Sequence, residues 1–467
     1  MSHECCEGVR GLRFSRRYFL KQGGVALVGM SAMPAFLQRA VAATPMPNKK
    51  QLVVLFQRGA ADGLNVVVPF GESNYYRMRP TIAIPAPKHG GRGSGSVPAN
   101  PELRGSGFVL ANPELRGSGF VLANPELNGD AAIDLDGFFG LHPSLAPLEP
   151  LFHKNQLAIV HAAGSPDPTR SHFDAQDFME SGTPGVKATE DGWLDRALET
   201  LPEENSSPFR AVAMGPNLPR MLRGSAGAIA LPDVRQFKVM TQSPAMGQMV
   251  EGGFEAMYAQ TVDQALHGTG TETFEAIDLL RKADPTKYQP ENGAQYPTSR
   301  LGQSLQQIGQ LLKANIGVEV LFVDCGGWDN HVNEGGVQGQ LSNLLKDLGH
   351  GLAAFHQYMA DRMHDIVFVT MREFGRTAKE NGNRGTDHGH ANCMFVMGGG
   401  VRGGQVYGKW PGLADHQLNE GRDLALTTDF RSVLGEVLVK HIGAKDLNAV
   451  FPGFDNNPRK FPGLIKT

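Results

Sequence analysis

The chain has 467 residues, of which 58 are glycine, about 12% of the total, where about 7% is usual in globular proteins. Lys and Arg number 44 against 47 Asp and Glu, which gives a net charge of −3, while 41% of the residues are hydrophobic and 19% are charged. These values exclude collagen, coiled coils and wholesale disorder, and the lack of a basic surplus argues against a nucleic-acid partner.

The N-terminal segment predicts an export signal. Arg16 and Arg17 stand side by side, an apolar stretch follows at 23–37, and the small residues at 40–42 fit a cleavage site. These are features of a twin-arginine signal peptide, and the stretch is too short to span about 30 Å of hydrocarbon. We expect a signal peptide at 1–42 and a periplasmic or secreted mature protein without a transmembrane segment. The segment holds six basic and two acidic residues, so its removal changes the net charge to −7.

Five short β-rich runs alternate with helical stretches along the mature chain, at 52–56, 157–161, 318–323, 366–370 and 394–397. Apolar strands that alternate with helices indicate an α/β fold with a mostly parallel central sheet covered by helices on both faces. Polar or Gly-rich residues follow each run, including Gly398 to Gly400 after the last one. Ligands of open α/β sheets bind beyond the carboxyl ends of the strands, so we expect these loops to converge.

One stretch departs from this pattern. Residues 99–110 read ANPELRGSGFVL, residues 111–122 repeat these letters, and residues 123–127 begin a third copy. The copies are too few and too Gly-rich for a solenoid with its own core. We interpret 88–130 as a Gly-rich insertion in one α/β domain that spans 43–467, because surface loops accept insertions at small entropic cost.

The first two candidate sites follow the first two runs. Asp62 lies on a turn with little side-chain bulk, where a carboxylate could coordinate a cation or act as a turn residue or helix N-cap. Ser171 precedes a helical stretch, and as an N-cap its hydroxyl would lie where helix N–H groups stabilise negative charge. That position suits a nucleophile and equally suits an ordinary cap.

Stronger metal signals follow the next runs. Asp324, Asp329 and His331 offer three ligands within eight residues, and two intervening glycines let the chain fold around a cation. Further along, Glu373 follows the 366–370 run, and the segment 387–390 packs one carboxylate and two imidazoles into four residues. This density favours metal binding over isolated histidines. The metal candidates are Asp62, Asp324, Asp329, His331, Glu373, Asp387, His388 and His390.

These candidates come from four expected strand ends and are enough for two divalent cations, whether zinc, magnesium, calcium or manganese. Two metals about 3.5–4 Å apart can clamp the attacking and leaving oxygens of an ester displacement, and a Ser hydroxyl bound to one of them is activated.

The arrangement resembles the alkaline phosphatase and sulfatase superfamily. Over nearly the whole mature chain it is similar to domain-of-unknown-function family 1501, a bacterial branch placed beside the sulfatases. The segments that carry this resemblance are 58–65, 169–176, 191–194, 326–331, 373–376, 385–389, 428–432 and 450–453. The resemblance implies an alkaline-phosphatase-like three-layer sandwich.

The resemblance also implies residue roles. It makes Asp62, Asp324, Asp329 and His331 metal ligands, with Glu373 or Asp387 in the later acidic role and His388 or His390 in the later imidazole role. The implied catalytic residues are the nucleophile Ser171, its rival Thr169, and Arg170 as a donor to the ester oxyanion. The segment 165–170, SPDPTR, does not match the Cys/Ser-x-Pro-x-Arg motif of sulfatases that form formylglycine.

We therefore expect an exported metal-dependent hydrolase of phosphate or sulfate esters, acting on a small molecule or a polysaccharide and closer to a phosphatase or phosphodiesterase than to a sulfatase proper. The alternative is a non-catalytic exported binding or scaffold protein that retains the fold. A further hypothesis is a disulfide between Cys325 and Cys393, the two cysteines that remain after signal cleavage.

Overall fold

A computed structural model describes residues 50–88, 130–202, 207–236 and 279–466. The predicted signal peptide and almost all of the predicted insertion at 88–130 lie outside these ranges, so both remain predictions. Within the described ranges, no helix is long and apolar enough to cross a membrane.

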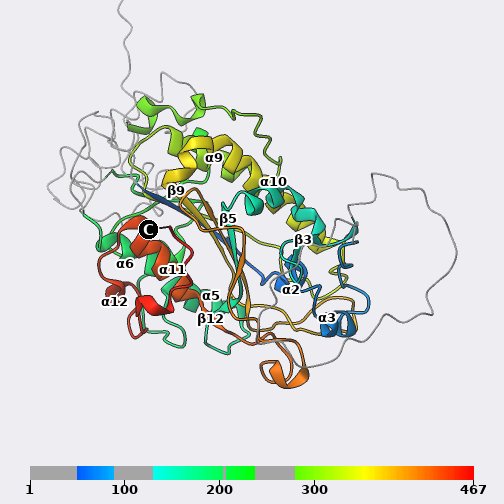
Figure 1. Cartoon of the computed structure of the whole chain (residues 1–467). Helices are drawn as coiled ribbons and strands as arrows, with labels where there is room; N and C mark the ends of the chain where they lie inside the picture. Colours follow the sequence, from blue (N-terminus) through cyan, green and yellow to red (C-terminus); the bar gives the residue numbers. More distant parts are fainter. Residues whose placement is uncertain (1–49, 89–129, 203–206, 237–278, 467) are drawn as a thin grey trace, which may run out of the picture.

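A nine-stranded sheet forms the centre of the described part of the chain (Figure 1). Its strand order is β11-β5-β10-β9-β1-β8-β6-β7, and β12 also pairs with β5. The strands are β1 (Gln51–Gln57), β5 (Leu157–Gly164), β6 (Ala211–Met214), β7 (Ile229–Ala230), β8 (Val320–Cys325), β9 (Ile366–Met371), β10 (Asn392–Gly398), β11 (Val406–Tyr407) and β12 (Thr428–Asp429). All five predicted runs are strands of this sheet. A second sheet has three short strands, β2 (Val67–Val68), β4 (Gly140–Leu141) and β3 (Ile133–Asp134).

Helices cover both faces of the large sheet. The α-helices of the described residues are α2 (Gly63–Val66), α3 (Ser73–Met78), α4 (Glu149–His153), α5 (His172–Ser181), α6 (Trp193–Glu199), α9 (Arg300–Lys313), α10 (Gln340–Met359), α11 (Phe430–Val437) and α12 (Leu447–Val450). In Figure 1, α9 and α10 lie on one side of the sheet, and α6, α11 and α12 lie on the other. The predicted α/β fold with a mostly parallel, doubly covered sheet is therefore confirmed.

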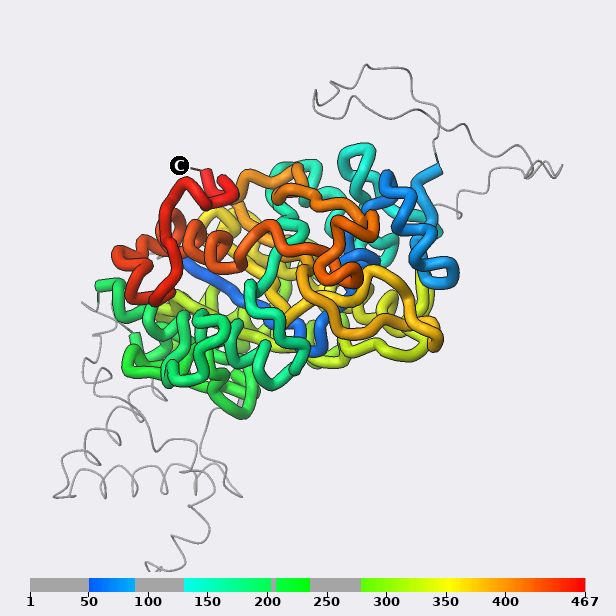
Figure 2. Tube along the Cα trace, turned by 90° about the horizontal axis from the view of Figure 1, so that it is seen from below, coloured from blue at the N-terminus to red at the C-terminus, as the bar shows by residue number. Residues whose placement is uncertain are grey.

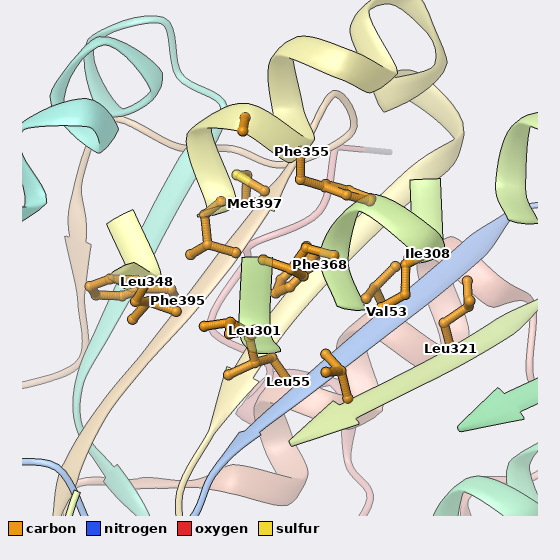
Figure 3. Close-up of a cluster of buried hydrophobic side chains, with 14 of the residues drawn as sticks. Val53, Leu55, Leu301, Ile308, Leu321, Leu348, Phe355, Phe368, Phe395 and Met397 are labelled. Atoms are coloured by element: carbon orange, nitrogen blue, oxygen red, sulfur yellow. The ribbon is translucent and has the colours of Figure 1, made fainter. Parts of the chain in front are cut away.

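Strand β1 shows why the sequence gives this arrangement. Val53 and Leu55 belong to the core on the α9 and α10 face, where Figure 3 shows them near Leu301 and Ile308 of α9. The alternate residues Leu52, Val54 and Phe56 belong to the core on the opposite face. A strand buried on both faces needs a continuous apolar run, which is the pattern that predicted it. Figure 2 shows β1, in blue, passing through the middle of the molecule between segments from later in the chain.

The direction of β10 changes which loops meet. Its pairings with β5 and β9 are antiparallel, whereas the pairings of β1 with β8 and β9 are parallel. The start of β10 therefore shares an edge with the carboxyl ends of β1, β5, β8 and β9. The expectation that Gly398 to Gly400 join the other loops is wrong. The N–H of Gly399 donates instead to the carbonyl of Met363, just before β9 begins, at 2.8 Å.

Candidate metal centre

One buried arginine ties together the loops that follow β1, β8 and β9. The Arg376 guanidinium donates to the carbonyl oxygens of Ala60 at 2.6 Å, Gly59 at 2.7 Å and Thr386 at 3.1 Å. It also forms an ion pair with Asp329. A planar guanidinium has five donors in a fixed geometry, so this residue fixes the three loops relative to one another.

Three potential metal ligands meet beside this arginine. They are His172 at the start of α5, Asp329 after β8 and His388 before β10. The Nε2 atoms of His172 and His388 lie 3.0 Å apart, and the Asp329 carboxylate lies 3.2 Å from His388 and 3.5 Å from His172. One ligand atom from each residue lies within 4.8 Å of the other two. Imidazole nitrogen and carboxylate oxygen are common ligands of divalent metals in proteins.

His331 lies against the same group. Its Nε2 is 2.9 Å from Nε2 of His388 and 3.0 Å from the Asp329 carboxylate. We call His172, Asp329, His331 and His388 the metal cluster. Three of its four members were predicted, and all four come from the edge of the sheet where ligands of α/β proteins bind.

Each imidazole of the metal cluster is oriented through its Nδ1 atom. The neighbouring oxygens belong to Glu373 for His172 (2.9 Å), to Asp387 for His331 (3.2 Å) and to the Arg170 carbonyl for His388 (2.8 Å). These oxygens accept hydrogen bonds, so Nδ1 carries a proton, and Nε2 is the ring nitrogen whose lone pair is left for a metal. Lone pairs at this separation repel unless a cation or a proton lies between them. Histidines that bind metal are commonly held in this way.

Glu373 is an almost fully buried anchor for His172. Its Oε1 atom accepts hydrogen bonds from the Gly59 N–H at 2.7 Å, from His172 and from Gln176 at 3.0 Å. Burial alone would raise the pKa of Glu373, but the hydrogen bonds, first that of His172, lower it overall. The same bond raises the pKa of His172. Glu373 therefore orients His172 within the metal cluster and is not itself one of the cluster ligands.

The surroundings of Asp329, His388 and Asp387 favour the deprotonated form of each of these side chains. Burial alone would raise the pKa of Asp329, but the Arg376 guanidinium and the nearby imidazoles lower it overall. Burial lowers the pKa of His388. Burial also opposes ionisation of Asp387, yet hydrogen bonds from Asn381 and His331 lower its pKa. A carboxylate and a neutral imidazole are the forms that bind metal.

The structure places Asp62 and Asp324 outside the metal cluster, each paired with an arginine. Asp62 is buried against Arg79, with one oxygen 2.9 Å from the guanidinium. Asp324 accepts a hydrogen bond from Arg58 at 2.7 Å. Both carboxylates already have an arginine as cationic partner, so their negative charge is balanced without a metal ion.

His390 also lies apart from the metal cluster. Burial lowers its pKa, and the charged groups that act on it include Asp423 and Arg170 rather than the cluster carboxylate. Of the two histidines that were candidates for the later imidazole role, the structure brings His388 to the metal cluster.

The three candidate catalytic residues precede α5, and each already has a hydrogen-bond or ion-pair partner within the protein. Ser171 is the N-cap of α5, and its hydroxyl accepts a hydrogen bond from the Asp174 N–H at 3.5 Å. The Thr169 hydroxyl accepts one from the Ser171 N–H at 3.2 Å. The Arg170 guanidinium is paired with Asp423 at 2.6 Å and with Glu420 at 2.7 Å. His172, which directly follows them, was not predicted as a ligand. The feature of the sequence that could have indicated this ligand is the position of His172 at the start of the helical stretch that follows the 157–161 run.

The hypothesis of a disulfide between Cys325 and Cys393 is wrong, because both cysteines are free. The Cys393 sulfur accepts a hydrogen bond from Arg372 at 3.1 Å, and the Cys325 sulfur accepts one from the Trp328 indole at 3.4 Å. Burial raises the pKa of Cys325 to about 12, so this thiol remains protonated at neutral pH.

The fold and the metal cluster define an α/β protein with a candidate metal centre. Residues 49–450 match the family described as protein of unknown function, DUF1501, so the chain belongs to this family, as predicted. No curated protein matches the sequence. Among solved structures, the chain is similar to the crystal structure of PsFucS1 sulfatase from Pseudoalteromonas sp., with 12% identity, a TM-score of 0.36, and coverage of 96% of this chain and 77% of that one.

Proposed function

We propose that the protein is an exported, metal-dependent hydrolase of phosphate or sulfate esters. The observation that supports this most is the convergence of imidazole Nε2 atoms and one carboxylate at the ligand-binding edge of the sheet. His172, Asp329 and His388 would hold one divalent ion, and this ligand set suits zinc. Three protein ligands leave a position for substrate, and a bound ion would polarise an ester oxygen as a Lewis acid.

His331 is then available to transfer a proton. Asp387 holds its Nδ1 atom, which leaves Nε2 directed toward the metal cluster, and 38% of the side chain is exposed. An imidazole that a carboxylate orients in this way can accept a proton at Nε2 and donate it to a leaving oxygen. Arg376 stabilises the arrangement, because it donates to the carbonyls of Trp328 and Thr386, in the loops that carry His331 and His388.

Ser171 is the proposed nucleophile. It directly precedes His172, and its bond to the helix N–H is long at 3.5 Å, so its hydroxyl is only weakly held. Thr169 remains the rival, since its hydroxyl lies two residues earlier and bonds to the Ser171 backbone. Arg170 is a weaker candidate for the oxyanion role, because two carboxylates already neutralise its guanidinium.

Those same contacts favour a second candidate, a non-catalytic exported binding or scaffold protein. A serine that caps a helix and an arginine paired with Asp423 and Glu420 both serve structural roles. In this case the metal cluster would hold a structural ion, with His331 as its fourth ligand, as in closed tetrahedral sites.

Turnover of an ester panel distinguishes the two candidates. The metal-loaded mature protein is assayed with p-nitrophenyl phosphate, bis(p-nitrophenyl) phosphate and p-nitrophenyl sulfate, beside the variants Ser171→Ala and Thr169→Ala. The hydrolase proposal expects Ser171→Ala to lose at least 100-fold in kcat. Ser299→Ala is the matched control, since Ser299 caps α9 away from the metal cluster with a bond of 3.0 Å. Absence of turnover in the metal-loaded wild type would favour the scaffold.

A further inference from the structure

A polar pocket lies at the edge of the sheet that also carries the metal cluster. It has a volume of about 380 Å³, and its lining includes Phe322 of β8 and Met214 at the end of β6. Its charged lining residues are Arg58, Arg220, Arg223, Arg300, Glu180 and Asp324, and we call it the arginine pocket. A volume of this size accommodates a small organic ligand.

The carboxylates of the arginine pocket are already used within the protein. Arg58 pairs with Asp324 at 2.7 Å and with Glu180 at 2.9 Å. The second oxygen of Glu180 accepts a hydrogen bond from the Met221 N–H at 3.1 Å. Arg220 pairs with Asp177, which does not line the pocket. The acidic residues therefore neutralise Arg58 and Arg220, but not Arg223 or Arg300.

Arg223 and Arg300 are left with positive charge that no described carboxylate balances. Both are exposed, and Arg223 uses only its Nε atom, which donates to the Leu218 carbonyl at 3.2 Å. Their terminal nitrogens thus provide donors at a pocket whose four lining arginines outnumber its two lining carboxylates. Guanidinium groups in this setting bind carboxylate, phosphate or sulfate through paired hydrogen bonds.

The arginine pocket also connects with the metal cluster. Arg58 donates to the Gln176 side-chain oxygen at 2.9 Å, and the Gln176 amide donates to Glu373 at 3.0 Å. Glu373 in turn holds His172. In addition, β8 carries Asp324 to the arginine pocket and then leads into the loop that carries Asp329. A ligand in the pocket would therefore lie beside the metal cluster without sharing its ligands.

We propose that the arginine pocket is a binding site for an oxyanion group, a carboxylate, phosphate or sulfate of a small acidic ligand, held by Arg223 and Arg300. The site requires no hydrolysis, so it stands whether the protein is an enzyme or a scaffold. In an enzyme it would bind a second acidic group of the substrate, apart from the ester at the metal cluster.

Isothermal titration calorimetry of the mature protein tests this inference with three probes, inorganic phosphate, sulfate and glutarate. The variants are Arg223→Ala/Arg300→Ala, Arg223→Lys/Arg300→Lys and Asp329→Asn, and the control is Arg459→Ala, which removes an exposed arginine elsewhere. Melting temperatures of all variants establish that each is folded.

We expect saturable binding of at least one probe, weakened at least tenfold in the double alanine variant and less in the double lysine variant, which keeps the charge. Arg459→Ala should bind within about twofold of wild type, and Asp329→Asn should still show saturable binding that Arg223→Ala/Arg300→Ala lacks. The probe that binds most tightly identifies the acidic group. The proposal is overturned if no probe binds, if the double alanine variant binds normally, or if Asp329→Asn abolishes binding, because the anion would then occupy the metal cluster.

Discussion

The carboxylate of Glu373 should control metal affinity although it is not one of the cluster ligands. In Glu373→Gln the side chain keeps its length, and its amide oxygen can still accept from the His172 Nδ1–H, but the negative charge is lost. Loss of a carboxylate that orients a metal-binding imidazole typically weakens metal affinity 10- to 100-fold. This corresponds to about 1.4–2.7 kcal/mol of binding free energy.

Folding stability should fall as well, for a separate reason. The second oxygen of Glu373 is buried and has no hydrogen-bond partner among the described residues. Glutamine would place an amide NH₂ group at that position or displace one of the existing donors. An unsatisfied buried donor costs about 1–3 kcal/mol of the free energy of unfolding.

Competition with a chromophoric chelator measures the metal affinity, and thermal unfolding in excess chelator measures the metal-free stability. The matched control is Asp387→Asn, which makes the same change beside His331, but at a side chain that is 55% exposed. Water solvates an exposed side chain after its charge is removed, so Asp387→Asn should weaken metal affinity by less than tenfold. The reasoning would be refuted if Glu373→Gln binds metal as tightly as wild type, or if it loses less metal affinity than Asp387→Asn does.

Three further predictions concern stability and thiol chemistry. Burial lowers the pKa of His161 from 6.5 to about 4, so the unfolded state takes up the proton at a higher pH than the folded state. As the pH falls from 7 to 4, the free energy of unfolding of wild type should therefore decrease by up to about 3 kcal/mol relative to that of His161→Gln. Urea unfolding at each pH measures this difference, and a difference that does not change with pH would contradict the prediction. A Cβ on Gly385 would lie 2.3 Å from a main-chain oxygen, so Gly385→Ala should destabilise by about 1–3 kcal/mol, whereas Gly382→Ala, with nothing within 4 Å, should change stability by under about 0.5 kcal/mol in thermal unfolding. Titration of denatured protein that lacks the predicted signal peptide 1–42 should find two free thiols, from Cys325 and Cys393, and the native protein should react far more slowly; no thiol would indicate a disulfide.

The central sheet could be predicted because its strands are buried on both faces. Such strands need unbroken apolar runs, and all five runs in the sequence belong to the sheet. The strands β7, β11 and β12 have two residues each, too few for any periodicity. The antiparallel direction of β10 depends on tertiary pairing, so the sequence placed the Gly398 to Gly400 loop at the wrong edge.

The metal cluster was predicted in part because dense groups of Asp and His after strands are rare without a ligand. Asp62 and Asp324 fit the same pattern, but Arg79 and Arg58 pair with them in the fold, and the sequence gives no sign of such pairing. His172 could not be predicted, because a single histidine before a helical stretch carries little signal until the fold brings it to His388.

The metal content of the purified protein tests the proposed metal centre most directly. Elemental analysis after dialysis should find one divalent ion per chain in wild type and less than a tenth of that in His388→Ala. His350→Ala, which removes an exposed histidine of α10, should retain the ion. Wild-type protein that takes up no divalent metal after exposure to zinc, manganese and magnesium, or a His388→Ala variant that retains its ion, would contradict the proposed centre.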